Sequence, residues 1–580
     1  MLFSEASLPK TNAFSELSTD EWWKSAVVYQ IYPRSFQDSN GDGFGDLQGI
    51  RSRLGYLKEL GVDVLWLSPI YRSPQADNGY DISDYQDIDP VFGTMKDFDQ
   101  LVADVHALGM KLVMDLVVNH TSDEHPWFVE SRSSLDNPKR DWYYWRDPRP
   151  GFEGGTPGAE PTNWESFFSG PVWKYDPATG QYYLHLFAEQ QPDLNWENPE
   201  VRQAVYEMMR WWLDRGVDGF RMDVINLISK VPELPDGTPA PGRALADGSP
   251  FYMEGPRLHE FLQEMHREVF DGRGALFTVG ETPGVLLENA HLYSDPARHE
   301  VNMIFQFEHV ILGLPEGKFG RRALEEGDLA DCLTRWQEGL VERGWNSLYL
   351  CNHDQPRTVS RFGDEKYWYD SATALATALH LLRGTPYVYQ GEELGMSNTV
   401  FEGIDDFEDI ESTNYYRLAV ERGEDPQAVL SGLRAMGRDN ARTPVQWDGS
   451  AHAGFTTGTP WIALNPNYPV INASEQVGDP TSVFAYFKAL IELRHRLAVV
   501  ANGSFERIDA GSREIFAYRR VLGERELIVI ANLSSRDAQP SLPSEISEAA
   551  PEFVPVLTNA NVWEEMDAPL APWRARVFLA

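Results

Sequence analysis

Eight short apolar runs recur along the chain, and helical spacing of apolar residues fills most of the segments between them. The runs are rich in aliphatic and aromatic residues and do not alternate with polar ones, which is typical of strands buried on both faces. Parallel strands need helical crossovers. The pattern predicts an α/β fold, a (β/α)8 TIM barrel, with a doubly wound open sheet as the alternative. The runs cover residues 27–33, 62–71, 111–120, 217–225, 275–282, 301–310, 346–354 and 385–395.

Two segments depart from this alternation. Residues 121–190 are dominated by Gly, Pro and aromatic residues without helical period, so we interpret them as a subdomain inserted after the third strand. From about residue 496, short strands with turn residues between them predict a C-terminal antiparallel β-domain. The expected organisation is an N-terminal extension over 1–20, the barrel over 21–120 and 191–495, the inserted subdomain over 121–190 and the β-domain over 496–580.

The charge balance limits the kinds of partner. The chain has 50 basic and 88 acidic residues, a formal net charge of −38. Such a surface repels phosphate backbones and anionic lipids, so we expect neither nucleic acid nor membrane as a partner. No run approaches the roughly 18 apolar residues of a membrane span, and the first residues lack a signal-peptide pattern. With only Cys332 and Cys351, we expect a cytoplasmic protein that is a monomer or a weak homo-oligomer.

Polar side chains stand at the ends of the predicted strands. In a barrel of this type the carboxyl ends of the strands open on one pocket. Unpaired buried charges cost several kcal/mol each, so a whole set of them indicates function rather than structure. The set comprises Asp115, Asn119 and His120 on the third strand, Arg221 and Asp223 on the fourth, Glu281 on the fifth, and His353 and Asp354 on the seventh.

The segment GFRMDVIN, residues 219–226, places a cation beside a carboxylate inside an apolar run. Arg221 and Asp223 are two positions apart, so a strand points both to one face. Taken alone, they are either a structural ion pair or the floor of an active site. In the second case Arg221 lowers the pKa of Asp223 and keeps it ionised. An apolar strand end raises the pKa of Glu281 and keeps it protonated.

Other catalytic motifs are missing. The sequence contains no His-Glu-x-x-His zinc motif, no Gly-x-x-x-x-Gly-Lys-Ser/Thr phosphate loop and no Gly-x-Ser-x-Gly nucleophile elbow. Carboxylates remain, and they are the groups that cleave acetals. A retaining glycosidase uses one ionised carboxylate as nucleophile and one carboxylic acid about 5 Å away as proton donor.

Four blocks, DLVVNH, GFRMDVIN, VGETPGV and NHDQPR, resemble in order and rough spacing the signature regions of glycoside hydrolase family 13. The stretches QIYPRSFQDSNGDGFGDLQGI, DNGYDISDY and RDNARTPVQWD resemble its oligo-1,6-glucosidase (isomaltase) and α-glucosidase branch. The resemblance runs from Trp22 to about residue 450. It implies that Asp223 is the nucleophile and Glu281 the acid/base. It also implies that Asp354 stabilises the transition state through the sugar's 2- and 3-hydroxyls.

The same resemblance implies a set of sugar contacts. Asp77 and Arg442 pair at the closed end of the pocket and hold the non-reducing 4-hydroxyl, so single glucose units leave from chain ends. The other implied residues hydrogen-bond the glucose, orient the nucleophile, stack on the ring or line the entrance. They are His120, His353, Arg221 and Tyr80, with Phe168, Phe187 and Gln191 from the inserted subdomain.

The residue after the nucleophile bears on linkage. In this branch Val resembles the enzymes that act on α-1,6 bonds, and Ala or Thr those that act on α-1,4 bonds. Val224 thus indicates isomaltose, isomalto-oligosaccharides or panose, although Val is also a good strand residue. Thr282 is a departure, since oligo-1,6-glucosidases commonly have Met there. The Arg-Leu-Asp-Arg-Asp segment of sucrose isomerases is absent, and HVILGLPEGKFGRR follows the sixth strand instead.

DSNGDGFGD, residues 38–46, carries oxygen ligands at alternate positions. It matches the first part of an EF-hand loop, with Gly43 at the sharp turn. The twelfth position is Gly49 instead of Glu, so a complete EF-hand is absent. We expect a structural Ca²⁺ after the first strand and no organic cofactor. The predicted ligands are Asp38, Asn40, Asp42, the carbonyl of Phe44, and Asp46.

Three functions remain open. The favoured one is a retaining, exo-acting α-glucosidase that hydrolyses α-1,6 bonds, with α-1,4 or sucrose-type bonds as further targets, in short oligosaccharides. The alternative is a transferase or isomerase of the sucrose isomerase or trehalose synthase type, because a glycosyl-enzyme also reacts with sugar hydroxyls. A non-catalytic relative is disfavoured because Asp223 and Glu281 are both present.

Overall fold

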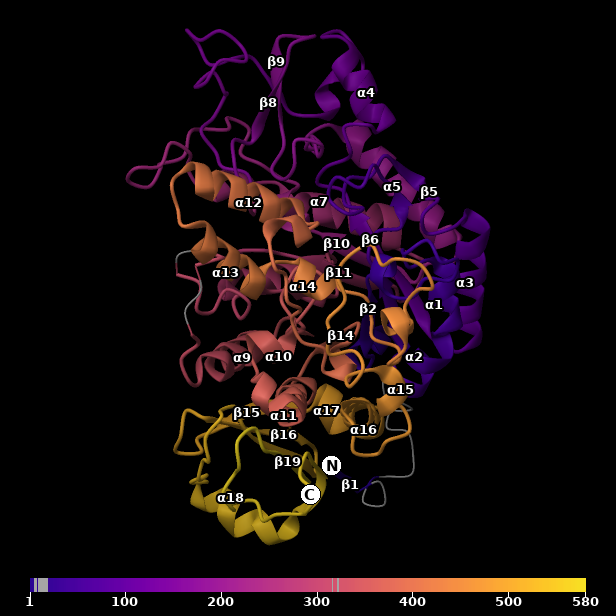
Figure 1. Cartoon of the computed structure of the whole chain (residues 1–580), viewed down its shortest axis with the longest axis vertical. Helices are drawn as coiled ribbons and strands as arrows, with labels where there is room; N and C mark the ends of the chain where they lie inside the picture. The colour runs from indigo at the N-terminus through magenta and orange to yellow at the C-terminus, as the bar shows by residue number, and fades with distance from the viewer. Residues whose placement is uncertain (5–7, 9–18, 316, 321–322) are drawn as a thin grey trace.

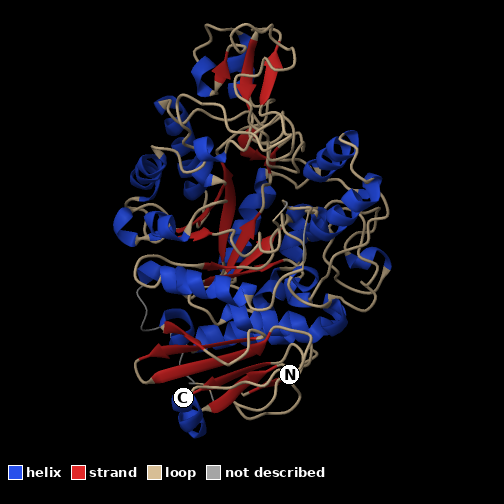
Figure 2. Cartoon of the chain, turned by 90° about the vertical axis from the view of Figure 1, so that its left-hand side faces the viewer, coloured by secondary structure: helices blue, strands red, loops and turns tan. Residues whose placement is uncertain are grey.

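The computed structural model describes residues 1–4, 8, 19–315, 317–320 and 323–580. A barrel occupies the middle of the molecule, a small sheet lies at one end and a larger sheet lies at the other (Figures 1 and 2). Both termini lie at the end that carries the larger sheet.

Eight parallel strands form the central sheet, in the order β12-β11-β10-β6-β3-β2-β14-β13. A parallel bridge between Ile304 and Asn346 brings the two edge strands together, so the sheet nearly closes. The TIM-barrel prediction is confirmed, and the open-sheet alternative is wrong. The strands are β2 (Val28–Ile31), β3 (Val64–Leu67), β6 (Lys111–Val117), β10 (Gly219–Asp223), β11 (Phe277–Glu281), β12 (Met303–Phe305), β13 (Ser347–Leu348) and β14 (Thr385–Tyr389).

Helices cover the outside of the barrel (Figure 2). Their starts are specified locally: Thr94 and Asp97 form a capping box at α3, and Asn198 caps α5 ahead of Pro199. The helices are α1 (Leu47–Ser52), α2 (Leu54–Leu60), α3 (Met95–Ala107), α5 (Pro199–Asp214), α7 (Leu258–Met265), α8 (Leu287–Ser294), α9 (Asp328–Gly339), α11 (Trp368–His380) and α16 (Val483–Arg496).

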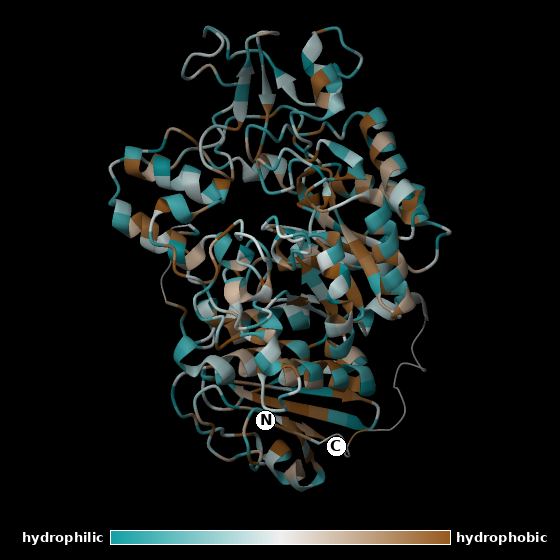
Figure 3. Ribbon diagram, turned by 45° about the vertical axis from the view of Figure 1, so that its right-hand side comes forward, coloured by the Kyte–Doolittle hydropathy of each residue, from teal (hydrophilic) through white to brown (hydrophobic). Residues whose placement is uncertain are grey.

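Each strand has an inner and an outer face. Val64 and Trp66 of β3 belong to the cluster inside the barrel, with Val113 and Val279, whereas Leu65 packs outward into the large core under the helices. Figure 3 shows hydrophobic stretches along the strands in the middle of the molecule. The two-residue period then places Asp115, Arg221, Asp223 and Glu281 on the inner face, at the carboxyl ends of their strands.

The segment after β6 folds as a three-stranded antiparallel sheet in the order β7-β9-β8. The loop after β10 packs on it: Trp164 bridges to Ala246, and Trp164 Nε1 donates 2.8 Å to the carbonyl of Pro235. The inserted subdomain and this loop therefore share one core. The elements are α4 (Pro126–Ser133), β7 (Trp145–Arg146), β8 (Trp173–Asp176) and β9 (Gln181–Leu184).

The C-terminal region forms a six-stranded antiparallel sheet that includes β1 (Leu2–Phe3). Leu2 pairs with Thr558, so the start of the chain joins the C-terminal sheet, a contact that sequence reasoning missed. No helix in the described ranges has the length and apolar character to cross a bilayer. The other strands are β15 (Ser504–Ile508), β16 (Ile515–Leu522), β17 (Arg525–Asn532), β18 (Val554–Thr558) and β19 (Ala575–Leu579).

Candidate active site

Arg221 lies among three buried carboxylates at the carboxyl end of the barrel. Its Nη1 lies 2.7 Å from Oδ1 of Asp115 and 2.6 Å from Oδ1 of Asp223. Its Nη2 lies 2.6 Å from Oε1 of Glu281. The strand order explains this, because β10 lies between β6 and β11 and registers Arg221 directly against Asp115. One guanidinium therefore holds carboxylates from three neighbouring strands.

Asp223 and Glu281 bind the two ends of one planar fork, Nη1 and Nη2 of Arg221. The fork is rigid and holds its partners at a fixed spacing. That arrangement is compatible with the separation of about 5 Å in retaining glycosidases. The structure thus brings together the two carboxylates to which the sequence assigned the chemistry.

Burial raises the pKa of Glu281 to about 8, against the opposing effect of Arg221. Burial also raises the pKa of Asp223 to about 7, with a further contribution from the charge of Asp115. The predicted direction is right for Glu281 and wrong for Asp223, because burial and Asp115 together outweigh Arg221. The proton still stays on Glu281 to higher pH than on Asp223, as an acid and a nucleophile require.

Val224 is not part of the strand, contrary to the sequence reading. β10 ends at Asp223, and Val224 adopts the left-handed region with φ 35° and ψ 43°. A β-branched residue is strained there, and such strain clusters at functional sites. The turn aims the N–H of Val224 at Glu281, whose Oε2 accepts it at 3.0 Å.

Asp354 follows β13 and accepts from two arginines: Oδ1 lies 2.9 Å from Arg442 Nη2 and 3.4 Å from Arg438 Nη1. Burial acts to raise the pKa of Asp354, but His353, Arg438 and Arg442 hold it well below its usual range. Burial lowers the pKa of His353 to about 3, so this imidazole is neutral at pH 7. At that pH the two arginines are therefore the groups that lower the pKa of Asp354. Asp354 is therefore a permanent anion.

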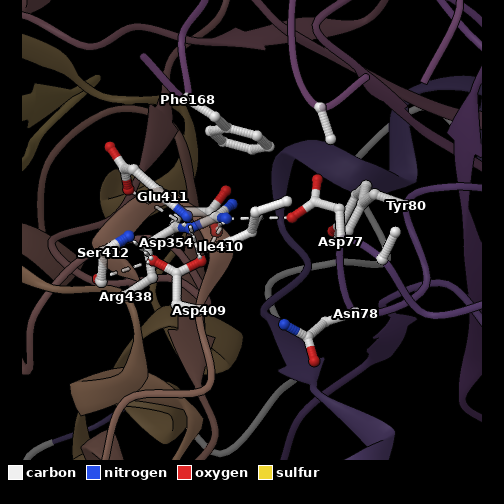
Figure 4. A network of polar contacts seen from close by, with 12 residues as sticks. Asp77, Asn78, Tyr80, Phe168, Asp354, Asp409, Ile410, Glu411, Ser412 and Arg438 are labelled. Carbon is white, nitrogen blue, oxygen red and sulfur yellow. Dashed lines mark hydrogen bonds and ion pairs between the residues drawn. The ribbon is translucent and has the colours of Figure 1, made fainter. Parts of the chain in front are cut away.

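The predicted pairing of Asp77 with Arg442 is wrong. In the described structure Asp77 pairs with Arg438 at 3.0 Å, and Arg442 pairs with Asp354. Figure 4 shows Arg438 between Asp77 on one side and Asp409 on the other. Sequence reasoning missed Arg438, although it opens the quoted RDNARTPVQWD block, and it missed Asp409.

Aromatic and imidazole groups surround this network. The ring of Tyr80 stacks on His353 at 5.1 Å, and its hydroxyl donates 3.1 Å to Oδ2 of Asp115. His120 Nε2 lies 3.2 Å from the carbonyl of Tyr80. Gln30, a polar residue in the first apolar run that sequence reasoning passed over, lies 2.8 Å from Nδ1 of His353.

The inserted subdomain and the residue directly after it, Gln191, supply three of the predicted residues. Gln191 Nε2 donates 3.1 Å to Oδ2 of Asp77 and lies 3.2 Å from Nε2 of His120. The ring of Phe168 covers the guanidinium of Arg438 at 4.7 Å (Figure 4). Phe187 lies between the rings of His120 and Phe168, at 5.2 and 5.5 Å.

The predicted calcium loop is held by its own hydrogen bonds. Asp38 accepts from the N–H of Asn40 and from that of Gly43, at 2.8 and 2.9 Å. Asp46 caps α1 by accepting from Gly49 N at 2.7 Å. Within the described ranges no three His, Cys, Asp or Glu side chains are gathered as a metal site. Asp42 and the carbonyl of Phe44 lie on the same loop.

The chain is similar over most of its length to proteins of a known family. The family model described as the α-amylase catalytic domain matches residues 30–503. The oligo-1,6-glucosidase of Parageobacillus thermoglucosidasius is 57% identical, with 96% of this chain and 98% of that one covered. The oligo-1,6-glucosidase of Bacillus cereus is 52% identical, with 96% and 99% covered.

Solved structures agree in fold. The trehalose-6-phosphate hydrolase of Bacillus licheniformis superposes with a TM-score of 0.89 at 46% identity, covering 96% of this chain and 99% of that one. The trehalulose synthase of Pseudomonas mesoacidophila MX-45 gives 0.90 at 42% identity, covering 97% and 100%. The chain belongs to the α-amylase family, glycoside hydrolase family 13.

Proposed function

We propose that the protein is a retaining, exo-acting α-glucosidase that hydrolyses α-1,6 glucosidic bonds at the non-reducing ends of short oligosaccharides. The observation that carries the proposal is the sharing of Arg221 by Asp223 and Glu281. Relatives named oligo-1,6-glucosidase at 57 and 53% identity support the linkage. The Val at position 224 supports it as well.

In the first step, a carboxylate oxygen of Asp223 attacks the anomeric carbon. The bond from that carbon to the glycosidic oxygen breaks, and Glu281 gives its proton to the leaving oxygen. In the second step, the Glu281 carboxylate takes a proton from water while the water oxygen attacks the same carbon. Asp223 leaves as a carboxylate, and the glucose keeps its α-configuration.

The surroundings of Glu281 suit a group that changes charge. Arg221 Nη2 faces one oxygen of its carboxyl and the Val224 N–H faces the other. Both donors stabilise the carboxylate that forms when the proton leaves. Burial opposes that charge, so the pKa of Glu281 stays high enough for the acid form to exist at neutral pH.

The buried residues around Asp77 support cleavage at the ends of sugar chains. Asp77 accepts a hydrogen bond from Gln191 and pairs with Arg438, and all three side chains are buried. A closed end of this kind accommodates a chain terminus and excludes a continuing chain. Asp354 would accept hydrogen bonds from the 2- and 3-hydroxyls of the bound glucose.

Product analysis tests the proposal. The purified protein is incubated with isomaltose, panose, maltose, sucrose, trehalose and trehalose 6-phosphate, and products are separated by chromatography. We expect glucose, released fastest from isomaltose and panose, and none from an Asp223→Asn variant. Isomerised sucrose as the main product, or fastest cleavage of trehalose 6-phosphate, would overturn the proposal.

Ca²⁺ binding at residues 38–46 remains part of the proposal. The loop offers only oxygen donors, which is the chemistry Ca²⁺ prefers. The loop is tied to a distant segment, since Asp38 also accepts from the hydroxyl of Thr456. Asp38, Asn40, Asp42, the Phe44 carbonyl and Asp46 would hold the ion, which would join these two segments without taking part in the chemistry.

We also propose a cytoplasmic location for the protein, as a monomer or a weak homo-oligomer. Its two cysteines, Cys332 and Cys351, are buried and free, which suits a reducing compartment. Fractionation of cells that produce the protein, and light scattering of the purified protein, test the two statements.

A further inference from the structure

Gln30 lies on the first barrel strand, β2, and contacts the imidazole of His353. We propose that Gln30 is a positioning residue that fixes both the orientation and the tautomer of this imidazole. In that tautomer Nδ1 accepts a hydrogen bond and Nε2 carries the proton. The inference rests on the proposed function and deepens it, because His353 is one of the groups that would face the bound glucose.

The strand backbone holds Gln30 inside the barrel. Gln30 registers against Trp66 of β3 on one side and against Tyr389 of β14 on the other. Val28, two residues earlier, belongs to the inner cluster together with Trp66, so the two-residue period points Gln30 into the same interior. Gln30 is 1% exposed, and a buried amide costs free energy unless it is hydrogen-bonded.

The amide nitrogen of Gln30 reaches two acceptors. Its Nε2 lies 2.8 Å from Nδ1 of His353 and donates to Oγ of Ser68 at 3.2 Å. An amide nitrogen carries two hydrogens and accepts none, so it donates in both contacts. Nδ1 of His353 is then the nitrogen without a proton.

The other nitrogen of the imidazole faces a carboxylate. Nε2 of His353 lies 3.3 Å from Oδ2 of the ionised Asp354. An unprotonated Nε2 would turn its lone pair toward this anion, whereas a protonated Nε2 is attracted to it. Burial lowers the pKa of His353 to about 3, so the ring holds a single proton at pH 7. Asp354 places that proton on Nε2, in agreement with the acceptor role that Gln30 gives to Nδ1.

The aromatic neighbours of His353 do not make this choice. The rings of Tyr80 and Tyr32 lie nearly parallel to the imidazole, at 6° and 16°, and Trp66 meets it at 89°. They fix the plane of the ring, but a half-turn about the Cβ–Cγ bond keeps that plane and exchanges nitrogen for carbon at its edges. In the part of the chain that the structure describes, Gln30 is the side chain that bonds Nδ1. It therefore holds one of the two orientations.

Nuclear magnetic resonance of the whole chain labelled with ¹⁵N-histidine measures the tautomer, and a His353→Asn variant assigns the signal. At pH 7 we expect the wild type to carry the proton on Nε2 of His353, with Nδ1 bare. Gln30→Glu keeps the size of the side chain but replaces the donor by an acceptor, so a proton should appear on Nδ1. Gln30→Met offers neither, and both tautomers should appear.

The charged groups that face His353 remain the same in both Gln30 variants. They are Asp354, Arg221, Arg442 and Arg438. A change of tautomer therefore reports the Gln30 amide and not these charges.

Kinetics on isomaltose separate positioning from a contribution to folding alone. Gln30→Met should lower kcat/KM on the order of tenfold to hundredfold, since a buried hydrogen bond to a group facing the substrate is lost. Gln337→Met is the matched control. Gln337 is a buried glutamine of α9 whose amide bonds the backbone of Arg383, away from the catalytic cluster. It should lower the Tm and leave kcat/KM unchanged.

Three results overturn the inference while the proposed function stands. One is a wild-type His353 with its proton on Nδ1, and another is a tautomer that neither Gln30 variant changes. The third is an equal loss of kcat/KM in Gln30→Met and Gln337→Met, which would leave Gln30 a structural role only. If the wild type releases no glucose from isomaltose, the proposed function fails, and the tautomer measurement still tests the contact between Gln30 and His353.

Discussion

The backbone N–H of Val224 donates a hydrogen bond of 3.0 Å to Oε2 of Glu281. Val224 reaches this position only by leaving the strand for φ 35°, a conformation that costs a β-branched residue about 1–3 kcal/mol. Its side chain then packs into the core shared by the inserted subdomain and the loop after β10. The residue to which the resemblance assigns linkage preference thus also supports Glu281, the proposed proton donor.

Val224→Ala should raise kcat/KM on maltose relative to isomaltose. The hydrogen bond to Glu281 comes from the backbone and survives the substitution, so the change isolates the side chain. Removing methyl groups beside a substrate changes discrimination by about 1–3 kcal/mol, on the order of tenfold or more. Val217→Ala, a buried site before β10, is the control for lost volume. An unchanged ratio would remove Val224 from the account of linkage.

The pH dependence of kcat/KM should be bell-shaped, with its maximum between about 7 and about 8. Activity needs Glu281 protonated, so it falls as pH rises through about 8. Activity also needs Asp223 ionised, so it falls as pH drops through about 7. A profile that does not fall below pH about 7 and above pH about 8 contradicts the assignment.

Asp115→Asn should move the acidic limb of that profile to lower pH. The charge of Asp115 raises the pKa of Asp223, so its removal lets Asp223 ionise earlier. Asn keeps the size of the side chain near Trp66 and Tyr80. The exposed Asp136→Asn is the control and should not shift the limb. A limb that stays in place, or moves upward, would count against this electrostatic coupling.

Arg438→Ala should destabilise the protein far more than Arg417→Ala. Arg438 is buried between Asp77 and Asp409, and its loss leaves the buried Asp77 without an arginine and Asp409 with Arg442 alone, at a cost of about 3–5 kcal/mol. Arg417 pairs with Glu421 on an exposed helix face, where a pair contributes about 0–1 kcal/mol. Urea unfolding curves compare the two variants. Equal midpoints would show that the Arg438 network adds nothing to stability.

Chelation of Ca²⁺ should lower the Tm, and added Ca²⁺ should restore it. An ion that binds only the folded protein stabilises it by mass action. Asp42→Ala should abolish the response, whereas Asp136→Ala, at an exposed position elsewhere, should keep it. Thermal unfolding followed by circular dichroism makes the measurement. A Tm indifferent to chelator and to added ion would rule out the site.

The barrel could be predicted because its eight strands are mostly apolar on both faces and carry few charged residues, most of them toward their carboxyl ends. Arg221 and Asp223 share one face through the two-residue period, which is a local property. Glu281 joins them through the register of β10 against β11, in which Arg221 pairs with Val279. The pKa of Asp223 could not be derived in the same way. Its direction depends on burial in the closed barrel and on Asp115, which reaches Arg221 only through the register of β10 against β6.

The partner of Asp77 could not be chosen from the sequence either. Arg438 and Arg442 are four residues apart around the short helix α14 (Asp439–Arg442), so both point the same way. Which of them meets Asp77 depends on loops after β3 and β14 that are more than 300 residues apart. The pairing of β1 with β18 is another contact between distant segments that no local pattern signals.

The configuration of the first product tests the central claim most directly. Nuclear magnetic resonance can follow the anomeric protons of glucose released from isomaltose before mutarotation mixes the two forms. If Asp223 forms a covalent bond to the sugar and Glu281 serves first as acid and then as base, α-glucose appears first. Initial release of β-glucose would contradict the shared site around Arg221.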